Sequence, residues 1–330
     1  MSKKILLINF GGIGDEILFL PVVSALKSKF SDCEITLCTE PRAKCVKSLS
    51  KDIDYIITAD IKGKHKYFEL VKLYFKMLFG GYDAVFSSGS NKLIPILLFL
   101  SGIKKRVGFS NGSFSDKLLT RAVSLNKNRY AAKMYFELVK DETLSEFENP
   151  KIEADKLSGL DDCILIHPGV SLMSIKKGIY KNVNPSILQT VILELLRNNK
   201  RVVLAGGPDD AEIISKILEN KEICDNPLFL DYYGKTKNIF DLATLFNSVK
   251  LIFCCDSAPF HIASALNKKT VVFFGPTDEK KLVPENKNVA ILTAKCDCRP
   301  CLWDKRQVNC NDNFCLNISA EEILAEINRF

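Results

Sequence analysis

The sequence predicts an α/β protein made of two doubly wound domains, each with a parallel sheet covered by helices. Short apolar stretches alternate with amphipathic ones along most of the chain, as repeated βα units do. The chain has 330 residues, which suits two hydrophobic cores better than one. Residues 141–160 are polar and carry no clear period, so we place the boundary there and expect domains at 1–155 and 156–330.

The composition is that of an ordinary soluble protein, at 47% hydrophobic and 26% charged. No stretch reaches the roughly 18–20 uninterrupted apolar residues of a membrane span. The formal charge is +7, and residues 1–155 hold most of it, with 24 Lys and Arg against 18 Asp and Glu. This surplus fits either a solvated basic face or attraction to an anionic membrane or acidic glycolipid. We expect no nucleic-acid partner, because basic residues interleaved with aromatic ones in the RNA-binding manner are absent.

In the first domain, apolar strands and the helices between them follow one another in order. The expected strands are 4–10, 34–39, 55–58, 84–87 and 105–109, and the expected helices are 15–30, 41–49, 67–79 and 92–100. We interpret the apolar N-terminal run as the first strand and not as a signal peptide. It lacks a small-residue cleavage site and leads directly into a glycine loop.

The second domain repeats the alternation without an obvious internal repeat. The expected strands are 163–167, 201–205, 229–232, 251–255 and 270–274, and the expected helices are 185–198, 209–218, 239–247, 259–266 and 320–328, the last capped by Ser319. Two such domains facing each other would form a cleft, with ligands bound outside the carboxyl ends of the strands.

The sequence GGIGD, residues 11–15, follows the first strand. Gly12 and Gly14 match two glycines of a dinucleotide fingerprint, and Glu40 ends the second strand where a ribose-binding acid would lie, but the third glycine is missing. Asp15 would repel a pyrophosphate, whereas it would suit a general base facing an incoming hydroxyl. It would also suit the N-terminus of a helix, whose dipole favours an acid.

Four strand ends of the second domain carry small, turn-forming residues. They are HPGVS (167–171), AGGPDD (205–210), CDSAPFH (255–261) and FGPTD (274–278). Small residues let a ligand approach the backbone, and helix N-termini favour anions, so the four loops together indicate a nucleotide site. Asp256 or Ser257 can cap the helix that follows the third loop.

Two residue types near these loops, histidine and lysine, can contact a nucleotide diphosphate. His167 and His261 lie at strand ends and can donate to a phosphate or act as an acid or base, although each is as well explained by a structural role. Lys176 and Lys177 follow the first loop and can reach a diphosphate as point charges, although surface lysines are common in this chain.

Five of the twelve cysteines fall within residues 296–315, and the other seven are scattered as in a reduced protein. Cys298, Cys301, Cys310 and Cys315 could supply four thiolates to a structural zinc or iron, with Cys296 spare. Their spacing is not that of a standard zinc finger, so reduced thiols or disulfides remain alternatives.

These motifs together resemble glycosyltransferase family 9, the ADP-heptose:lipopolysaccharide heptosyltransferase family. The resemblance rests on NFGGIGDEILFLPVVSALKSKF, HPG, AGGPDDAE, the segment GKTKNIFDLATLFNSVKLIFCCDSAPFHIASALNKKTVVFFGPT and the closing cysteines. It implies the GT-B fold, in which two Rossmann-like domains face each other across a cleft. The first domain would bind the acceptor and the second the nucleotide-sugar donor. It also implies inverting chemistry that requires no metal.

The resemblance also implies roles for individual residues. Asp15 matches the catalytic base, in a loop that holds Gly11, Gly12 and Gly14. Lys176 or Lys177 matches the lysine that neutralises the leaving diphosphate. The implied donor-binding residues in the strand-end loops are Gly206, Asp256, Ser257, Ala258, His261 and Gly275. Ala258 stands where the family commonly has glycine. The family often carries a cysteine-rich segment like residues 296–315, and some protein-modifying relatives hold iron in it.

We therefore expect an inverting heptosyltransferase that uses ADP-heptose and a lipopolysaccharide-core-type acceptor, an anionic glycolipid or glycan. Its expected location is the cytoplasm, with a peripheral position at the inner face of the inner membrane. One alternative is a related transferase that acts on a protein or another surface glycan. More distant alternatives are an NAD-dependent oxidoreductase that uses Gly12, Gly14 and Glu40, and a binding module without catalysis.

Overall fold

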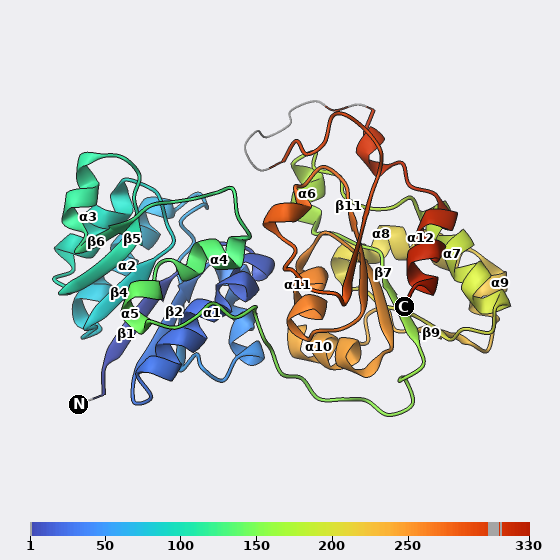
Figure 1. The fold of residues 1–330 in the computed structure, drawn as a ribbon, viewed down its shortest axis with the longest axis horizontal. Coiled ribbons are helices and arrows are strands. Elements are labelled where there is room, and N and C mark those ends of the chain that lie inside the picture. Colours follow the sequence, from blue (N-terminus) through green and yellow to red (C-terminus); the bar gives the residue numbers. More distant parts are fainter. Residues whose placement is uncertain (1, 303–309, 311) are drawn as a thin grey trace. The chain divides into compact units, whose positions relative to one another are not determined.

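The protein consists of two compact units, Met1–Lys151 and Ile152–Phe330, each built on one six-stranded parallel sheet (Figure 1). The structure is a computed structural model that describes residues 2–302, 310 and 312–330. No helix in the described part of the chain has both the length and the apolar character needed to cross a bilayer.

The N-terminal unit alternates strands and helices along the chain. Its strands are β1 (Lys4–Ile8), β2 (Glu34–Thr39), β3 (Tyr55–Thr58), β4 (Ala84–Ser87), β5 (Lys105–Phe109) and β6 (Arg121–Val123). Its α-helices are α1 (Ile13–Lys29), α2 (Lys66–Phe79), α3 (Leu93–Leu100), α4 (Ala131–Phe136) and α5 (Lys140–Thr143), with 3-10 helices η1 (Pro41–Leu49) and η2 (Phe114–Leu118).

The C-terminal unit follows the same plan. Its strands are β7 (Ile164–His167), β8 (Val202–Leu204), β9 (Phe229–Asp231), β10 (Leu251–Cys255), β11 (Thr270–Phe274) and β12 (Val289–Thr293). Its α-helices are α6 (Leu172–Lys176), α7 (Pro185–Arg197), α8 (Ala211–Leu218), α9 (Lys221–Cys224), α10 (Ile239–Ser248), α11 (Ala258–Ala265) and α12 (Ala320–Asn328). Three short 3-10 helices, η3 (Pro208–Asp210), η4 (Glu279–Lys281) and η5 (Phe314–Leu316), complete the unit.

The two sheets share one strand order, which confirms the predicted doubly wound class. The N-terminal sheet runs β3-β2-β1-β4-β5-β6 and the C-terminal sheet runs β12-β11-β10-β7-β8-β9. In each sheet the chain starts at a central strand and winds outward first one way and then the other. Ligands of such sheets bind outside the carboxyl ends of the strands where the winding direction changes. These positions lie between β1 and β4, and between β7 and β10.

In the N-terminal unit, α2 and α3 cover one face of the sheet. Leu6 and Ile8 of β1 point to this face and pack with Leu73 of α2 and Leu98 of α3. Because side chains alternate along a strand, Ile5 and Leu7 point to the opposite face, where α1 packs beside α4. Each helix therefore has one side against the sheet, and the opposite sides of α2 and α3 face away from the core.

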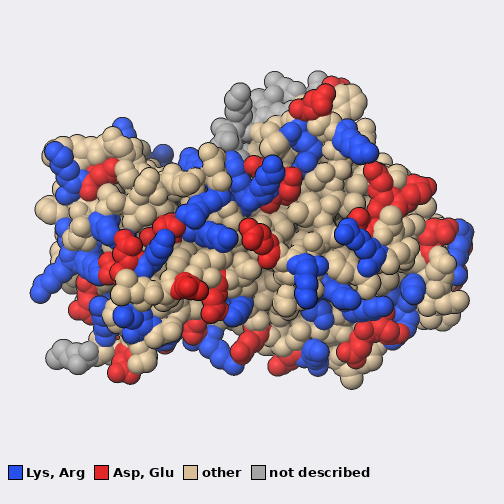
Figure 2. Space-filling model, in the orientation of Figure 1, with Lys and Arg blue, Asp and Glu red and all other residues tan. Residues whose placement is uncertain are grey.

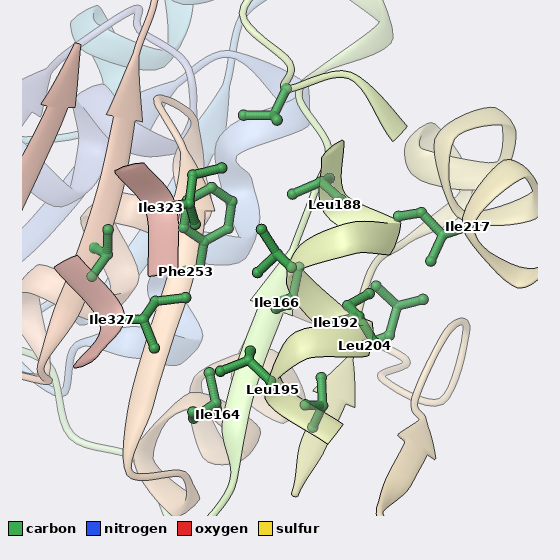
Figure 3. Close-up of a cluster of buried hydrophobic side chains, with 14 of the residues drawn as sticks. Ile164, Ile166, Leu188, Ile192, Leu195, Leu204, Ile217, Phe253, Ile323 and Ile327 are labelled. Carbon is green, nitrogen blue, oxygen red and sulfur yellow. The ribbon is translucent and has the colours of Figure 1, made fainter. Parts of the chain in front are cut away.

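In the C-terminal unit, α7, α8 and α12 pack on one face of the sheet. Figure 3 shows Ile166 of β7 and Phe253 of β10 in a cluster with Leu188 and Ile192 of α7 and Ile323 of α12. Helices α10 and α11 lie against each other elsewhere on the unit and α11 contacts β10 and β11. The predicted cap of α12 is confirmed, since Ser319 Oγ accepts from the Glu322 N–H and the Glu322 carboxylate accepts from the Ser319 N–H.

The structure also contains elements that the sequence pattern did not predict. Strands β6 and β12 extend the edges of their sheets. β6 has only three residues and begins with Arg121, so it gives little pattern. β12 is a short apolar run, VAILT, that the sequence analysis did not assign. Helix α4 was missed because it is short. The helix expected at 41–49 is a 3-10 helix, η1.

Candidate functional site

The glycine loop after β1 is closed by the carboxylates of the helix it precedes. Gly12 is the N-cap of α1, and its N–H donates to Asp15 Oδ2 at 2.8 Å. The Gly11 N–H donates to Glu16 Oε1 at 3.4 Å. A phosphate cradle needs free backbone N–H groups, and here two of them already bind acids. This geometry disfavours a phosphate-binding role for the loop.

Gly11 is required for the position of Asp15. A methyl group on Gly11 would overlap the Cβ of Asp15, whereas the nearest atoms to a methyl group on Gly12 would be 3.7 Å away, on Arg42 and Asp15. The side chain of Asp15 can therefore fold back over the loop only because residue 11 has no side chain.

Hydrogen bonds from residues that follow β1 and β4 hold the same loop in place. Asn9, which directly follows β1 and is buried, donates from Nδ2 to the backbone oxygen of Asp15 at 3.4 Å. Its Oδ1 accepts from Ser88 Oγ, just beyond β4. The loop thus lies at the point where the winding of the sheet changes direction, and both flanking strands hold it.

Glu16 is a buried carboxyl directly behind Asp15. Its Oε1 accepts from Thr39 Oγ1 at 2.7 Å, and its Oε2 has no hydrogen-bond partner among the described residues. Burial raises the pKa of Glu16 to about 8, and the hydrogen bonds from Thr39 and Asn9 only partly oppose it. Glu16 is therefore mostly protonated at neutral pH and adds no full negative charge behind Asp15.

Glu40 stands at the position where a ribose-binding acid would lie, and its carboxylate already has partners. It is buried, its Oε2 accepts from Arg42 Nε at 2.8 Å, and its Oε1 lies 2.5 Å from Lys62 Nζ. Lys62 also donates to the backbone oxygen of Phe10 at 2.7 Å, which brings a second cation beside the glycine loop. This arrangement disfavours a nicotinamide cofactor and leaves two basic side chains next to Asp15.

In the C-terminal unit, His167 and Asp210 lie behind the first two loops. His167 Nε2 is 3.7 Å from Asp210 Oδ2, which also accepts from the Gly207 N–H at 2.7 Å. Burial lowers the pKa of His167 and raises the pKa of Asp210, so both are held towards their neutral forms. A Cβ on Gly169 or Gly206 would overlap Asp210 or its neighbours, so these glycines let the two loops close around the carboxyl group.

The third loop is organised by a buried ion pair that the sequence analysis missed. Lys181 Nζ lies 2.6 Å from Asp256 Oδ2, and Asp256 is only 3% exposed. Burial alone would raise the pKa of Asp256, but the adjacent Lys181 outweighs it and holds that pKa below its usual value. Asp256 therefore remains an anion that fixes a lysine at the carboxyl end of β10.

The side-chain cap expected at the start of α11 requires correction. Ser257 is the N-cap residue, as expected, but its side chain makes no cap hydrogen bond, because its Oγ donates to the backbone oxygens of Cys255 and Gly169. Asp256 binds Lys181 instead. The N-terminus of α11, which starts at Ala258, therefore has no side-chain cap bond from its N-cap residue. His261, one turn further on, is buried against Phe260.

Lys176 and Lys177, the expected diphosphate lysines, are exposed at the end of α6. Neither has an ion-pair partner among the described residues, and the lysine that reaches the third loop is Lys181. The sequence signal for it was weak, because Lys181 is one of several lysines in KKGIYK and its partner lies 75 positions away.

The cysteine-rich segment packs on the fourth loop. Arg299 Nε donates to the Gly275 oxygen at 3.0 Å and its Nη2 bonds Glu279 Oε2 at 2.8 Å, while the Cys301 N–H donates to the Pro276 oxygen at 2.9 Å. A Cβ on Gly275 would meet Leu316 at 2.8 Å. The segment thus supports the loop of residues 274–278 from behind.

The five cysteines of this segment are free thiols. Cys298 Sγ is 3.5 Å from Cys296 Sγ, and burial together with the four neighbouring thiols raises the pKa of Cys315 to about 11. Over residues 2–302, 310 and 312–330, no group of three or more cysteine, histidine or carboxylate side chains is arranged to hold a metal ion.

A cavity of about 820 Å³ lies on the C-terminal unit among α6, α7, α8 and the start of α12. Leu172, Ile187 and Leu316 contribute to its apolar wall. It shares only Asp209 with the four strand-end loops, and neither Lys181 nor Asp256 lines it. We therefore place the candidate donor site at the loops and not in this cavity.

Comparison with known proteins identifies the family and supports the fold. The model of glycosyltransferase family 9 (heptosyltransferase) matches residues 75–311. Lipopolysaccharide heptosyltransferase 3 of Escherichia coli is 24% identical over 291 residues, which cover 80% of this chain and 81% of the relative.

Solved structures show the same architecture. The E. coli ADP-heptose lps heptosyltransferase II superposes with a TM-score of 0.77 at 19% identity, over 99% of this chain and 98% of that one. The iron-containing dodecameric glycosyltransferase TibC of enterotoxigenic E. coli superposes with a TM-score of 0.59 at 12% identity, over 99% of this chain and 76% of that one. The GT-B fold expected from the sequence is thereby confirmed.

The raised pKa of Glu16 predicts a measurable stability effect. Since folding raises this pKa from the usual 4.5 to about 8, its contribution is full below pH 4.5 and is lost as the pH rises towards 8. Wild-type protein should therefore lose stability relative to Glu16→Gln across this window, by on the order of 5 kcal/mol in total. Denaturant unfolding at several pH values measures the difference.

The matched control is Glu219→Gln, which changes an exposed glutamate in the other unit. Its stability should track the wild type at every pH. A difference between wild type and Glu16→Gln that stays constant from pH 5 to pH 8 would contradict the assignment.

Proposed function

The chain belongs to glycosyltransferase family 9, and we propose that it is an inverting enzyme that moves a heptose from ADP-heptose to a hydroxyl of a lipopolysaccharide-core-type acceptor. The names of its relatives, which specify lipopolysaccharide and ADP-heptose, support this substrate pair. The observation that carries the catalytic part is the placement of Asp15. Its carboxylate lies at the reversal point of the N-terminal sheet, in a loop whose geometry disfavours phosphate.

We assign the acceptor to residues 1–155 and the donor to residues 156–330. Arg42 and Lys62 beside the Asp15 loop support an anionic acceptor, because they add positive charge where its hydroxyl would arrive. Lys181 and the uncapped start of α11 support donor binding at the loops of the C-terminal unit, because both favour the diphosphate.

In the proposed reaction, Asp15 takes the proton of the acceptor hydroxyl. At the same time the oxygen of that hydroxyl forms a bond to the anomeric carbon of the sugar. The bond from that carbon to the β-phosphate oxygen breaks, and ADP leaves with the electron pair. Attack opposite to the leaving group inverts the anomeric centre. Lys181, in the role that the sequence analysis gave to Lys176 or Lys177, neutralises the charge that develops on the diphosphate. No metal is needed for these steps.

The neutral state of Glu16 supports the same role for Asp15. A second anion directly behind Asp15 would make proton abstraction easier but would also repel an anionic acceptor. With Glu16 protonated, a single negative charge faces the acceptor. The oxidoreductase alternative is disfavoured, since Glu40 is bound by Arg42 and Lys62 and the loop N–H groups are occupied.

Nucleotide titration tests the donor assignment. ADP should bind the purified protein without added metal, and UDP and NADH should bind far more weakly. Lys181→Gln removes a charge-assisted contact to phosphate, so ADP affinity should fall by about 10- to 100-fold. Isothermal calorimetry measures each constant.

The control is the pair Lys176→Gln and Lys177→Gln, whose affinities should stay within about twofold of wild type because both side chains are exposed. Lys181→Arg separates charge loss from unfolding, since it retains a cation for Asp256. Binding of NADH alone would overturn the proposal. Selective UDP binding would replace the sugar donor.

Catalysis by Asp15 predicts a second result. Asp15→Ala should reduce heptose transfer by at least about a hundredfold while ADP still binds, because a general base supplies that much. Gly11→Ala should also reduce transfer, since its methyl group displaces the Asp15 side chain. Gly12→Ala is the matched control and should stay near wild-type turnover, which a coupled assay of ADP release measures. Near-normal turnover of Asp15→Ala would defeat the assignment.

We also propose that the cysteine-rich segment, residues 296–315, binds a structural zinc or iron ion. Soft thiolate ligands suit these metals, and the fold neighbour TibC is an iron-containing protein. The thiol chemistry fits, while the described sulfurs are not yet arranged as a ligand set. A bound metal would draw them together and stiffen the support of the loop at 274–278.

Metal analysis tests this site. Protein purified without chelators should contain close to one zinc or iron per chain, and Cys298→Ser with Cys301→Ser should lose it. Cys45→Ser with Cys224→Ser is the control, because both cysteines lie outside the segment. Chelation should lower the unfolding temperature of the wild type and of this control, and should leave that of Cys298→Ser with Cys301→Ser unchanged. Absence of both metals from freshly purified protein would exclude the site.

A further inference from the structure

Helix α2 is apolar on two sides. Leu73 and Met77 face the sheet and are buried. A second stripe, spaced three and four residues apart, points to solvent and includes Phe68, Phe75 and Phe79, the last of which is 79% exposed. Phe75 and Phe79 stack in parallel with ring centroids 6.1 Å apart. An ordinary surface helix has a polar outer side, so an exposed apolar stripe of this kind indicates an interaction surface.

Helix α3 and η2 extend the stripe into a wider surface. Both α2 and α3 pack on the same face of the sheet, so their outer sides point away from it in the same direction. We call this surface the α2–α3 face. Its exposed apolar residues are Tyr67, Phe68, Val71, Phe75, Leu78, Phe79, Leu93, Ile96, Phe99, Leu100 and Phe114.

The segments that carry these elements are basic. Residues 62–79 and 92–117 hold ten lysines and arginines and only two acids, Glu69 and Asp116. Two of the ten, Lys62 and Lys105, pair with Glu40 and Glu142, which lie outside these segments. On the side of the N-terminal unit where Figure 1 draws α3, Figure 2 shows uncharged surface bordered by lysine and arginine side chains. Lys64, Lys66, Lys92, Lys104 and Lys117 have no ion-pair partner in the described part of the chain.

Several of these cations lie directly over the exposed rings. Lys72 Nζ is 4.5 Å from the centroid of Phe68, Arg106 lies over Phe99 at 5.4 Å, and Lys117 lies over Phe114 at 5.1 Å. Aromatic rings flanked by cations suit the boundary of a bilayer, where the ring enters the acyl region and the cation meets the phosphates. Since no described helix can span a membrane, the face would lie on the bilayer and not cross it.

We propose that the α2–α3 face docks the protein on an anionic lipid bilayer. The aromatic stripe inserts at the headgroup boundary, and the unpaired lysines bind lipid phosphates. A second copy of the chain fits this face less well, because a symmetric dimer would bring the unpaired lysines of this face against an identical set. A bilayer supplies both the apolar surface and the negative charge that this face lacks.

Vesicle flotation tests the proposal with the full-length protein. Wild type should bind vesicles of phosphatidylglycerol and phosphatidylcholine and float poorly with pure phosphatidylcholine. The variant Phe68→Ser, Phe75→Ser, Phe79→Ser should lose most binding. Charge reversal at Lys64, Lys66 and Lys104 to Glu should weaken partitioning by on the order of a hundredfold, since each lysine contributes roughly fivefold.

Two control variants change the same residue types elsewhere. Lys200→Glu, Lys221→Glu, Lys287→Glu reverses exposed lysines of the C-terminal unit, and Leu144→Ser, Leu157→Ser removes exposed leucines outside the face. Both should float like the wild type. Unchanged unfolding temperatures and ADP affinity across all variants show that the loss of flotation is not a loss of fold, and keep this test separate from that of the transferase activity.

Three outcomes would overturn the proposal. Equal flotation with neutral and anionic vesicles would remove the role of the lysines. Full flotation of the phenylalanine variant would remove the role of the stripe. A wild-type dimer by light scattering that this variant converts to monomer, without vesicle binding, would assign the face to a second copy.

Discussion

The arrangement of both candidate sites depends on the parallel order of the strands. In a parallel sheet all carboxyl ends lie along one edge, and reversal of the winding next to β1 and next to β7 leaves a gap there that no crossover helix covers. Asp15 follows β1, and the Lys181–Asp256 pair lies at the end of β10, beside β7. The candidate residues of each unit therefore lie where backbone topology, and not side-chain packing, provides open space.

The two units differ in the ionisation of the buried carboxyl group at the carboxyl edge of their sheets. The N-terminal unit keeps Glu16 protonated and lets Asp15 satisfy its own helix N-terminus, which excludes external anions from the loop. The C-terminal unit keeps Asp256 ionised with a lysine and leaves the start of α11 without a side-chain cap. Under the proposed function, the first edge would receive a hydroxyl that loses a proton, and the second a phosphate that gains negative charge.

Much of this could be predicted from sequence, and the failures have definite physical causes. The strands that are buried on both faces, and Asp15 beside its glycines, follow from local pattern. Lys181 could not be found in this way, because its importance comes from Asp256, a partner distant in sequence, and nothing local distinguishes it from Lys176 or Lys177. The side-chain cap bond expected from Asp256 or Ser257 is absent for the same reason, because Asp256 binds Lys181 and Ser257 Oγ donates to backbone oxygens, although Ser257 is the N-cap residue. Edge strands such as β6 lack the apolar run on which strand prediction depends.

Helix α2 shows a related limit of sequence-based prediction. Its apolar periodicity identifies a helix but does not say whether each side of that helix packs in the core or faces solvent. Leu73 and Met77 explain one apolar side through the core, and the sheet can bury no more than one side of a helix. Burying a phenylalanine side chain is worth roughly 1.5–3 kcal/mol, so Phe68, Phe75 and Phe79 leave several kcal/mol of hydrophobic stabilisation unused while they face water. The positive charge around them opposes self-association and favours an anionic surface. A transferase whose acceptor is a glycolipid would gain from such a surface, because attachment converts a search through solution into a search along the membrane that carries the acceptor.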